Sequence, residues 1–193
     1  MDRTRIGIYG GTFSPMHNGH LRVAMKAVEL GVVDQVWLMV TPLNPWRVEE
    51  HLLDNEARFG MVRRAVGKYP YLKACDFEFS LPVPQYSSRT LRALKEQYAD
   101  YDFSLIVGSD NWVRFKEWHD CDYIIENFPV ITFPRDGYPI VDIGYPVKVM
   151  DVECFDISST RLRSMVRNGE DITGYVPESV AQDIRNNGYY LQI

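Results

Sequence analysis

Apolar runs alternate with polar, glycine-rich breaks along the first forty residues. Arg5–Tyr9 is a short, mostly apolar run that leads into Gly10–Gly11, which predicts a strand entering a tight loop. Apolar residues then recur at i, i+3, i+4 and i+7 over Leu21–Val28, the spacing of an amphipathic helix. Val36–Val40 is continuously apolar, which is typical of a strand buried on both faces. Together these elements form one βαβ unit, whose two strands run parallel.

The same alternation continues along the rest of the chain. It predicts helices over 55–68, 88–98, 159–167 and 178–187, and strands over 71–79, 103–107, 128–133 and 146–152. We therefore expect an α/β fold with a Rossmann-like, doubly wound, mostly parallel sheet. The chain reads as a single domain over 1–193, with a core over 1–155 and a small helical C-terminal part over 156–193. Ligands of such sheets bind outside the carboxyl ends of the strands.

Composition and charge narrow the class of protein. The chain has 46% hydrophobic and 24% charged residues, and 21 basic against 26 acidic side chains give a net charge of −5. This is ordinary globular composition without the basic footprint of a nucleic-acid-binding protein. The longest apolar run is Val36–Val40, so we expect no membrane span, and we find no secretory signal. Three widely spaced cysteines without a CxxC pair favour free thiols in a cytoplasmic protein. Nothing in the sequence indicates an oligomeric state.

The loop between the first strand and the first helix carries candidate chemistry. Gly10 and Gly11 allow a sharp turn and a close approach to a ligand. His17 and His20 flank the start of a helix, where free N–H groups already favour an anion, and imidazoles can donate to phosphate oxygens or become cationic beside them. The two histidines could instead be surface residues or metal ligands. A metal site is disfavoured because no third ligand has a matching spacing.

A second candidate anion site precedes the helix over 159–167. Ser158 or Ser159 can cap this helix, and Arg163 follows about one turn later. Taken alone, the segment is more simply explained as a capped helix with solvated arginines, because capping is common.

Read together, the two segments resemble a known superfamily. Gly-Gly-Thr-Phe-Ser-Pro-Met-His-Asn-Gly-His, over 10–20, resembles the signature of the HxGH nucleotidylyltransferases, and Ile-Ser-Ser-Thr-Arg-Leu-Arg, over 157–163, resembles their ISSTxxR signature. The resemblance implies transfer of a nucleotidyl group to a phosphate acceptor, with His17, His20 and Arg163 as catalytic residues. The ATP-binding residues that it implies are Gly10, Gly11, Thr12, Phe13, His17, His20, Gly108, Asp110, Ile157, Ser158, Ser159, Thr160 and Arg163.

Further stretches, over 54–61, 84–91, 106–110 and 134–138, resemble the nicotinate mononucleotide adenylyltransferase branch. The resemblance implies that Trp118 stacks on the pyridine ring and that Ser87 holds its carboxyl group. The alternative is that Trp118 packs in the core. The chain departs from the branch at Arg89, where the family has Asp, and over 44–47, where Arg47 could replace a Lys. The implied mononucleotide-binding residues are Arg47, Tyr86, Ser87, Arg89, Trp118 and Arg135.

The reaction implied by this resemblance has nicotinate mononucleotide and ATP as substrates. The 5′-phosphate of the mononucleotide attacks the α-phosphorus of ATP, and pyrophosphate leaves as deamido-NAD forms. No general base is needed, because a phosphate monoester with a second pKa near about 6 is already largely dianionic. We expect Mg²⁺ to be held mainly by the ATP phosphates. The alternatives are a phosphopantetheine adenylyltransferase, which usually has Thr-x-Gly-His in the first signature, and a non-catalytic dinucleotide-binding module. A preference for nicotinate over nicotinamide does not follow from the residues.

Overall fold

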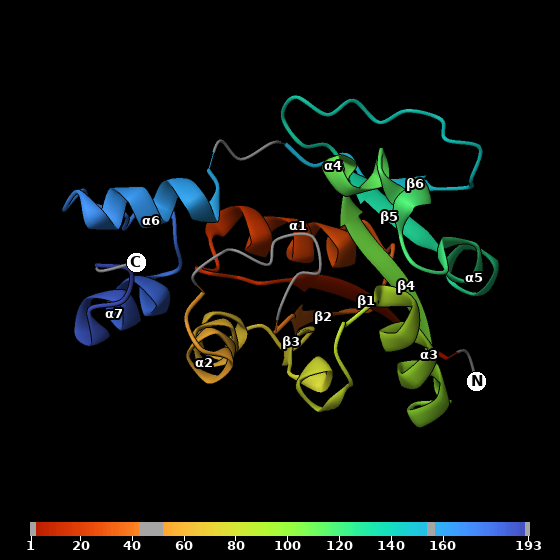
Figure 1. Ribbon diagram of the computed structural model, residues 1–193, viewed down its shortest axis with the longest axis horizontal. Helices are drawn as coiled ribbons and strands as arrows, with labels where there is room; N and C mark the ends of the chain where they lie inside the picture. Colours follow the sequence, from red (N-terminus) through yellow and green to blue (C-terminus); the bar gives the residue numbers. More distant parts are fainter. Residues whose placement is uncertain (1–2, 43–51, 154–156, 192–193) are drawn as a thin grey trace.

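A six-stranded sheet forms the centre of the molecule (Figure 1). The structure is a computed structural model that describes residues 3–42, 52–153 and 157–191. Every neighbouring pair of strands is parallel, and the strand order is β3-β2-β1-β4-β5-β6, which confirms the expected Rossmann-like fold. The strands are β1 (Thr4–Gly11), β2 (Gln35–Val40), β3 (Leu72–Cys75), β4 (Tyr101–Gly108), β5 (Val130–Phe133) and β6 (Lys148–Val149).

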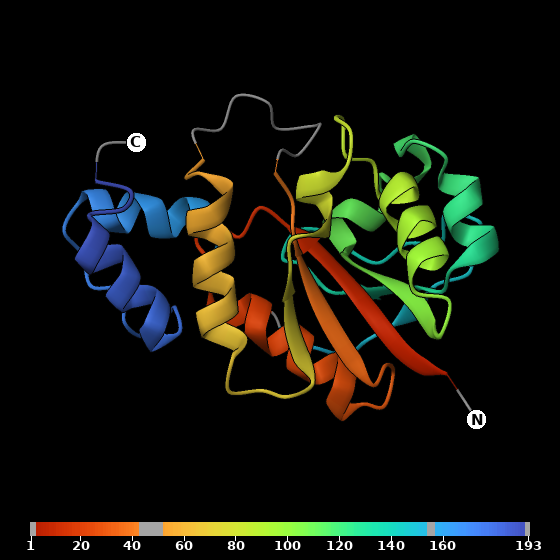
Figure 2. The same cartoon turned by 90° about the horizontal axis from the view of Figure 1, so that it is seen from below.

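Helices cover both faces of the sheet and bury one apolar cluster on each side. One cluster lies under α1 (Asn18–Glu29), α2 (Asn55–Val66), α6 (Ser159–Arg167) and α7 (Glu178–Asn187). The other lies under α3 (Ser87–Gln97), α4 (Ser109–Trp112), α5 (Cys121–Asn127) and the 3₁₀ helix η2 (Phe115–Glu117). Figure 2 shows the blue helices α6 and α7 beside the orange α2, which packs directly against α7. The described helices include none that is long and apolar enough to cross a bilayer.

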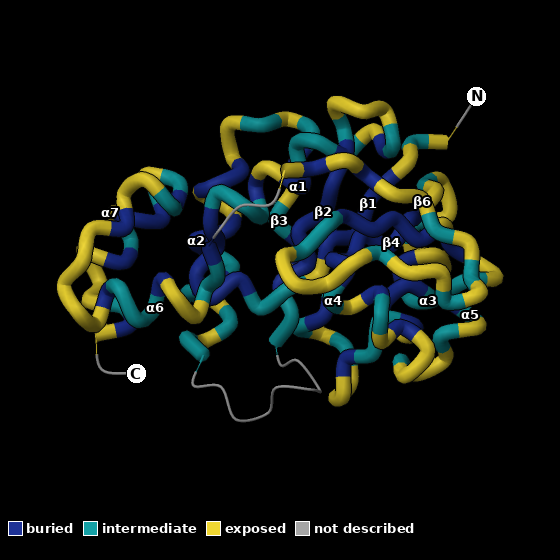
Figure 3. The backbone as a smooth tube through the Cα atoms, turned by 90° about the horizontal axis from the view of Figure 1, so that it is seen from above, coloured by how far each residue is buried: buried dark blue, intermediate teal, exposed yellow. Residues whose placement is uncertain are grey.

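The strand β2 has no alternation of apolar and polar residues, because apolar clusters cover both of its faces. Val36, Leu38 and Val40 belong to one cluster, whereas Trp37 and Met39 belong to the other. Successive side chains of a strand point to opposite faces, so a strand covered on both sides buries every position. Figure 3 shows the central strands as buried and the connecting loops as largely exposed.

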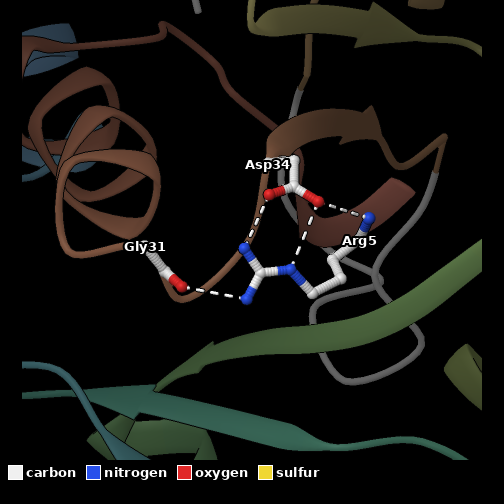
Figure 4. Close-up of polar contacts among 3 residues, drawn as sticks. All are labelled: Arg5, Gly31 and Asp34. Carbon is white, nitrogen blue, oxygen red and sulfur yellow. Dashed lines mark hydrogen bonds and ion pairs between the residues drawn. The ribbon is translucent and has the colours of Figure 1, made fainter. Parts of the chain in front are cut away.

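An arginine fixes the connection between α1 and β2 at the amino end of the sheet (Figure 4). Arg5 donates from its backbone N and from its guanidinium to the carboxylate of Asp34, over 2.8 and 2.6 Å. The same guanidinium donates to the carbonyl oxygen of Gly31 over 3.0 Å. Gly31 has φ +62° just after α1, as expected for a glycine that ends a helix. These contacts join the start of β1 to the residue that precedes β2, although an ion pair this exposed adds only about 0–1 kcal/mol.

Some predicted elements differ from the structure. The strand predicted over 71–79 is shorter, because β3 ends at Cys75 and a 3₁₀ helix, η1 (Phe77–Ser80), follows. The strand predicted over 146–152 is reduced to the two residues of β6. The short helices α4 and α5 were not predicted, since four and seven residues are too few to establish a helical period.

Candidate active site

A cleft of about 620 Å³ opens at the carboxyl ends of β1, β2, β4 and β5. It lies where the sheet order changes direction between β1 and β4, which is the switch point at which such sheets bind ligands. The N-terminal residues of four helices, α1, α3, α4 and α6, contribute to its lining. Free N–H groups at helix N-termini favour negative charge, so the cleft suits an anionic ligand.

The first loop of the site, residues 10–20, turns later than the sequence suggests. We expected the sharp turn at Gly10 and Gly11, but β1 continues through Gly11, and neither glycine has a positive φ. The turn falls at Phe13, a non-glycine residue with φ +46°. Phe13 is 2% exposed and packs edge-on against Tyr9 and His20. A residue in this conformation costs on the order of 1–3 kcal/mol, which the surrounding contacts must offset.

The two histidines of the loop lie together in the cleft. His17 is the N-cap of α1, and its ring stacks on that of His20 with 3.7 Å between the centroids. The backbone N–H of His17 donates to Nδ1 of His20 over 3.3 Å. Because Nδ1 accepts, the proton of a neutral His20 lies on Nε2. His20 therefore offers Nε2–H as a hydrogen-bond donor.

Burial keeps both imidazoles neutral, whereas the sequence had suggested that they could become cationic. Desolvation, with a smaller effect of Arg135, lowers the pKa of His17 from 6.5 to about 3. Desolvation, His17 and Arg135 together lower the pKa of His20 well below 6.5. At neutral pH the two uncharged histidines therefore offer N–H groups to a ligand, and the positive charge of the cleft comes from its arginines.

The second signature meets the first loop, as the sequence predicted. Ser159 Oγ donates to the carbonyl oxygen of Pro15 over 2.9 Å, and Arg163 Nη1 donates to that of Ser14 over 2.8 Å. Ser158 caps α6 by accepting from the N–H of Arg161. The cleft lining from this segment is Ser158, Ser159, Thr160 and Arg163. Capping and ligand contact are therefore compatible roles for the same serines.

The segment after α7 supports the loop from behind. The hydroxyl of Tyr190 lies 3.1 Å from Oγ of Ser14, and both residues are buried. Tyr190 has φ +66°, and burial raises its pKa above the usual range. Ser14 thus contacts Tyr190 through its side chain and Arg163 through its carbonyl, which fixes the loop from two elements.

Gly108 and its neighbours form the third part of the cleft wall. Asp110 and Arg135 both line the cleft and lie 3.8 Å apart. A Cβ at Gly108 would lie 2.4 Å from Oδ1 of Asp110, so the pair is accommodated only because position 108 has no side chain. Ser109 Oγ accepts from the backbone N of Arg135 over 2.8 Å and thereby holds that strand end in place.

Aromatic rings form the part of the cleft nearest α3. Tyr86 and His119 stack with 4.3 Å between centroids and an angle of 4°. Trp118 is half-buried, packs against Phe115 and also lines the cleft. The two interpretations of Trp118, core packing and ligand contact, are therefore compatible. Ser87 lies beside these rings at the first position of α3.

Two of the predicted residues that the structure describes are not among those that line the cleft. Arg89 is exposed, and its guanidinium lies 5.1 Å from the ring centroid of Tyr86. Ile157 is 5% exposed and packs in the apolar cluster under α6. Arg47 lies outside the described residues.

Sequence reasoning missed several groups that line the cleft. His119 was overlooked although it follows Trp118 directly. Glu78 is 5% exposed, accepts from Oγ1 of Thr90 over 2.7 Å, and has its pKa raised by burial. It lies on η1, where a strand was expected, so the pattern gave no reason to single it out. Within the described ranges, no three His, Cys, Asp or Glu side chains group into a metal site.

Comparisons with known proteins show which family this chain is similar to. The model of the cytidylyltransferase-like family matches residues 8–165. A probable nicotinate-nucleotide adenylyltransferase of Bacteroides fragilis is 38% identical over 95% of this chain and 92% of that protein. One from Flavobacterium johnsoniae is 38% identical over 96% of this chain and 98% of that protein. The structure of Plasmodium falciparum nicotinic acid mononucleotide adenylyltransferase complexed with NaAD has a TM-score of 0.81 at 20% identity and covers 97% of both chains.

Proposed function

This chain belongs to the cytidylyltransferase-like family and groups there with the nicotinate-nucleotide adenylyltransferases, and we propose that it makes deamido-NAD. It transfers the adenylyl group of ATP to the 5′-phosphate of nicotinate mononucleotide and releases pyrophosphate, a step of NAD biosynthesis. The observation that carries this proposal is the contact of Arg163 and Ser159 with the loop of His17 and His20 on one cleft.

The polyphosphate of ATP fits the wall formed by α1 and α6. Neutral His20 offers Nε2–H, and Arg163 supplies positive charge from the opposite segment. Both groups are fixed by hydrogen bonds to the loop before a ligand arrives. Donors held ready for developing charge lower a barrier more than mobile ones do, so they stabilise the leaving pyrophosphate. We assign His17, His20 and Arg163 to this task.

The acceptor fits the aromatic part of the cleft. A pyridinium ring lying over the indole of Trp118 gains a cation–π contact of about 1–2 kcal/mol when water is excluded. Its 5′-phosphate is then directed toward the α-phosphorus, with no proton to remove at neutral pH. Alignment and charge neutralisation therefore account for the rate, and no carboxylate or serine base is required.

Magnesium enters this scheme as part of the ATP substrate. The carboxylates of the cleft lining, Asp110 and Glu78, do not group with a third ligand in the described part of the chain. This suits an ion that keeps its water and is held by substrate phosphates. We also expect the protein in the cytoplasm, where its free thiols Cys75 and Cys121 stay reduced.

The test supplies MgATP with one acceptor at a time: nicotinate mononucleotide, nicotinamide mononucleotide or phosphopantetheine. Pyrophosphate release and the adenylylated product are both measured. We expect the highest kcat/KM with nicotinate mononucleotide and no turnover in EDTA. Turnover with phosphopantetheine alone would assign the chain to coenzyme A synthesis, and dinucleotide binding without turnover with any acceptor would make it a non-catalytic module.

A further inference from the structure

The largest charged side chain in the core belongs to a residue that the mechanism above does not use. Arg58 on α2 is completely buried, at 0% exposed. Its five N–H groups make five hydrogen bonds, so the guanidinium is fully satisfied. The acceptors are the carbonyl oxygens of Leu53, Thr12, Thr41 and Pro42 and the side-chain oxygen of Asn55.

These acceptors belong to three segments that diverge at the floor of the cleft. β1 and β2 are last joined where the N–H of Thr41 donates to the carbonyl oxygen of Gly11. Beyond that point Nη1 of Arg58 bridges the strand ends, because it donates to the carbonyls of Thr12 at 2.7 Å and Thr41 at 2.8 Å. The guanidinium therefore connects the two strands by hydrogen bonds where their backbone-to-backbone hydrogen bonds end.

The hydrogen bond to Thr12 lies next to the strained turn of the loop over 10–20. A trans peptide is planar, so holding the carbonyl of Thr12 also sets the direction of the next N–H, that of Phe13. That N–H points away from Arg58, and among the described residues no acceptor meets it. Phe13 is the residue with φ +46°, a conformation that persists only where its surroundings impose it.

We propose that Arg58 is a positioning residue for the reaction: it holds the Thr12–Phe13 peptide so that the loop over 10–20 is ready to receive the polyphosphate of ATP. The inference rests on the proposed function, since it assigns that loop to ATP. Arg58 itself lies behind Thr12, is not among the residues that line the cleft, and acts only through the backbone.

A lysine cannot replace this guanidinium. An ammonium group has three donors and no planar fork, so at least two of the five acceptors would lose their partner. The test uses Arg58→Lys and Arg58→Met, with Arg63→Met as the matched control, because Arg63 is exposed on the same helix. Calorimetry measures ATP binding, steady-state kinetics measures kcat and both KM values, and hydrogen exchange measures protection over 10–20. Thermal unfolding shows which variants are folded at the assay temperature.

For folded Arg58 variants we expect kcat/KM for ATP to fall by about 10²-fold, while KM for the mononucleotide changes little. Exchange at residues 11–14 rises in these variants and not in Arg63→Met. In Arg58→Ala, added guanidinium below its denaturing range restores part of the ATP affinity, whereas equal NaCl does not. A folded Arg58→Lys or Arg58→Met with unchanged ATP constants and unchanged exchange overturns the proposal.

Two further measurements keep the test decisive. If no Arg58 variant folds, Asn55→Ala removes only the acceptor at 2.6 Å, and we expect a smaller rise in KM for ATP with faster exchange at 11–14. No change in Asn55→Ala would leave Arg58 with a purely structural role and overturn the proposal. If the wild type has no transferase activity, the proposed function fails, but ATP binding and loop exchange still decide the role of Arg58.

Discussion

Arg163 Nη1 lies 2.8 Å from the carbonyl oxygen of Ser14 and so joins two residues that are 149 positions apart in the chain. Together with the hydrogen bond from Ser159 to Pro15, this contact joins the arginine to the loop of the two histidines. The guanidinium can orient itself on protein atoms and still present its remaining donors to the cleft.

The first prediction concerns the removal of the Arg163 guanidinium. Arg163→Ala should lower kcat/KM for ATP by about 10²–10³-fold, the usual cost of losing one electrostatic donor to a transition state. Arg163→Lys should recover only part of the loss, because an ammonium cannot serve Ser14 and a phosphate with the same geometry. Pyrophosphate release at varied ATP measures both. Arg167→Ala, at the end of the same helix, is the control, and an unimpaired Arg163→Ala would remove this residue from the mechanism.

His20 allows its two ring nitrogens to be tested separately. Asn places its oxygen near the position of Nδ1, which accepts from His17, whereas Gln places a donor near the position of Nε2. We expect His20→Asn to keep the loop folded and lose about 10²–10³-fold in rate, and His20→Gln to retain more activity. Rates are compared at saturating substrates. A His20→Asn enzyme with a near-wild-type rate would contradict the role given to Nε2.

The buried histidines predict how stability depends on pH. The unfolded chain binds a proton on His17 below about pH 6.5, whereas the folded protein does so only near pH 3. The free energy of unfolding therefore falls as pH falls through this window, by about 1.4 kcal/mol per pH unit for this group. We expect a lower Tm at pH 5 than at pH 7.5. The difference should be smaller in His17→Gln, and an equal difference in both proteins would show that His17 is not responsible.

Trp118 should affect only one of the two substrates. In Trp118→Ala we expect KM for the mononucleotide to rise about 5–30-fold, the equivalent of a lost contact of 1–2 kcal/mol. KM for ATP should stay within about twofold, because the part of the cleft to which we assign the polyphosphate is formed by α1 and α6. Trp118→Phe retains a π-face and should be intermediate. Equal increases in both KM values would indicate a general loosening of the cleft instead.

The spacing of apolar residues along the chain was sufficient to predict the α/β fold with its parallel sheet. The helix α6 has the predicted limits because a capping serine, Ser158, agrees with the apolar spacing, and α7 has them because its apolar spacing ends at Gly188. Pieces as short as α4 and α5 escaped, since fewer than two helical turns establish no period. In α2 the apolar spacing did not single out Arg58, although this charged residue shares the helical spacing of the buried Met61 and Val62.

The residues of the candidate site were predictable where they lie in one short segment of the sequence. Properties that depend on tertiary contacts were not predicted. His17, His20, Ser158 and Ser159 line the cleft as expected. The neutral state of the histidines depends on desolvation by the whole fold, which no local pattern reports. For the same reason the displacement of the turn to Phe13 was missed, since packing imposes a positive φ on a residue that does not favour it.

The position of Tyr190 behind Ser14 has a consequence for biosynthesis. The loop it supports follows β1, the first strand to be translated, whereas Tyr190 is added more than 170 residues later. A nascent chain on the ribosome can therefore form much of its sheet while the loop over 10–20 still lacks its contact with Tyr190. The enzyme acquires its complete catalytic cleft only after the segment following α7 has been synthesised and has docked.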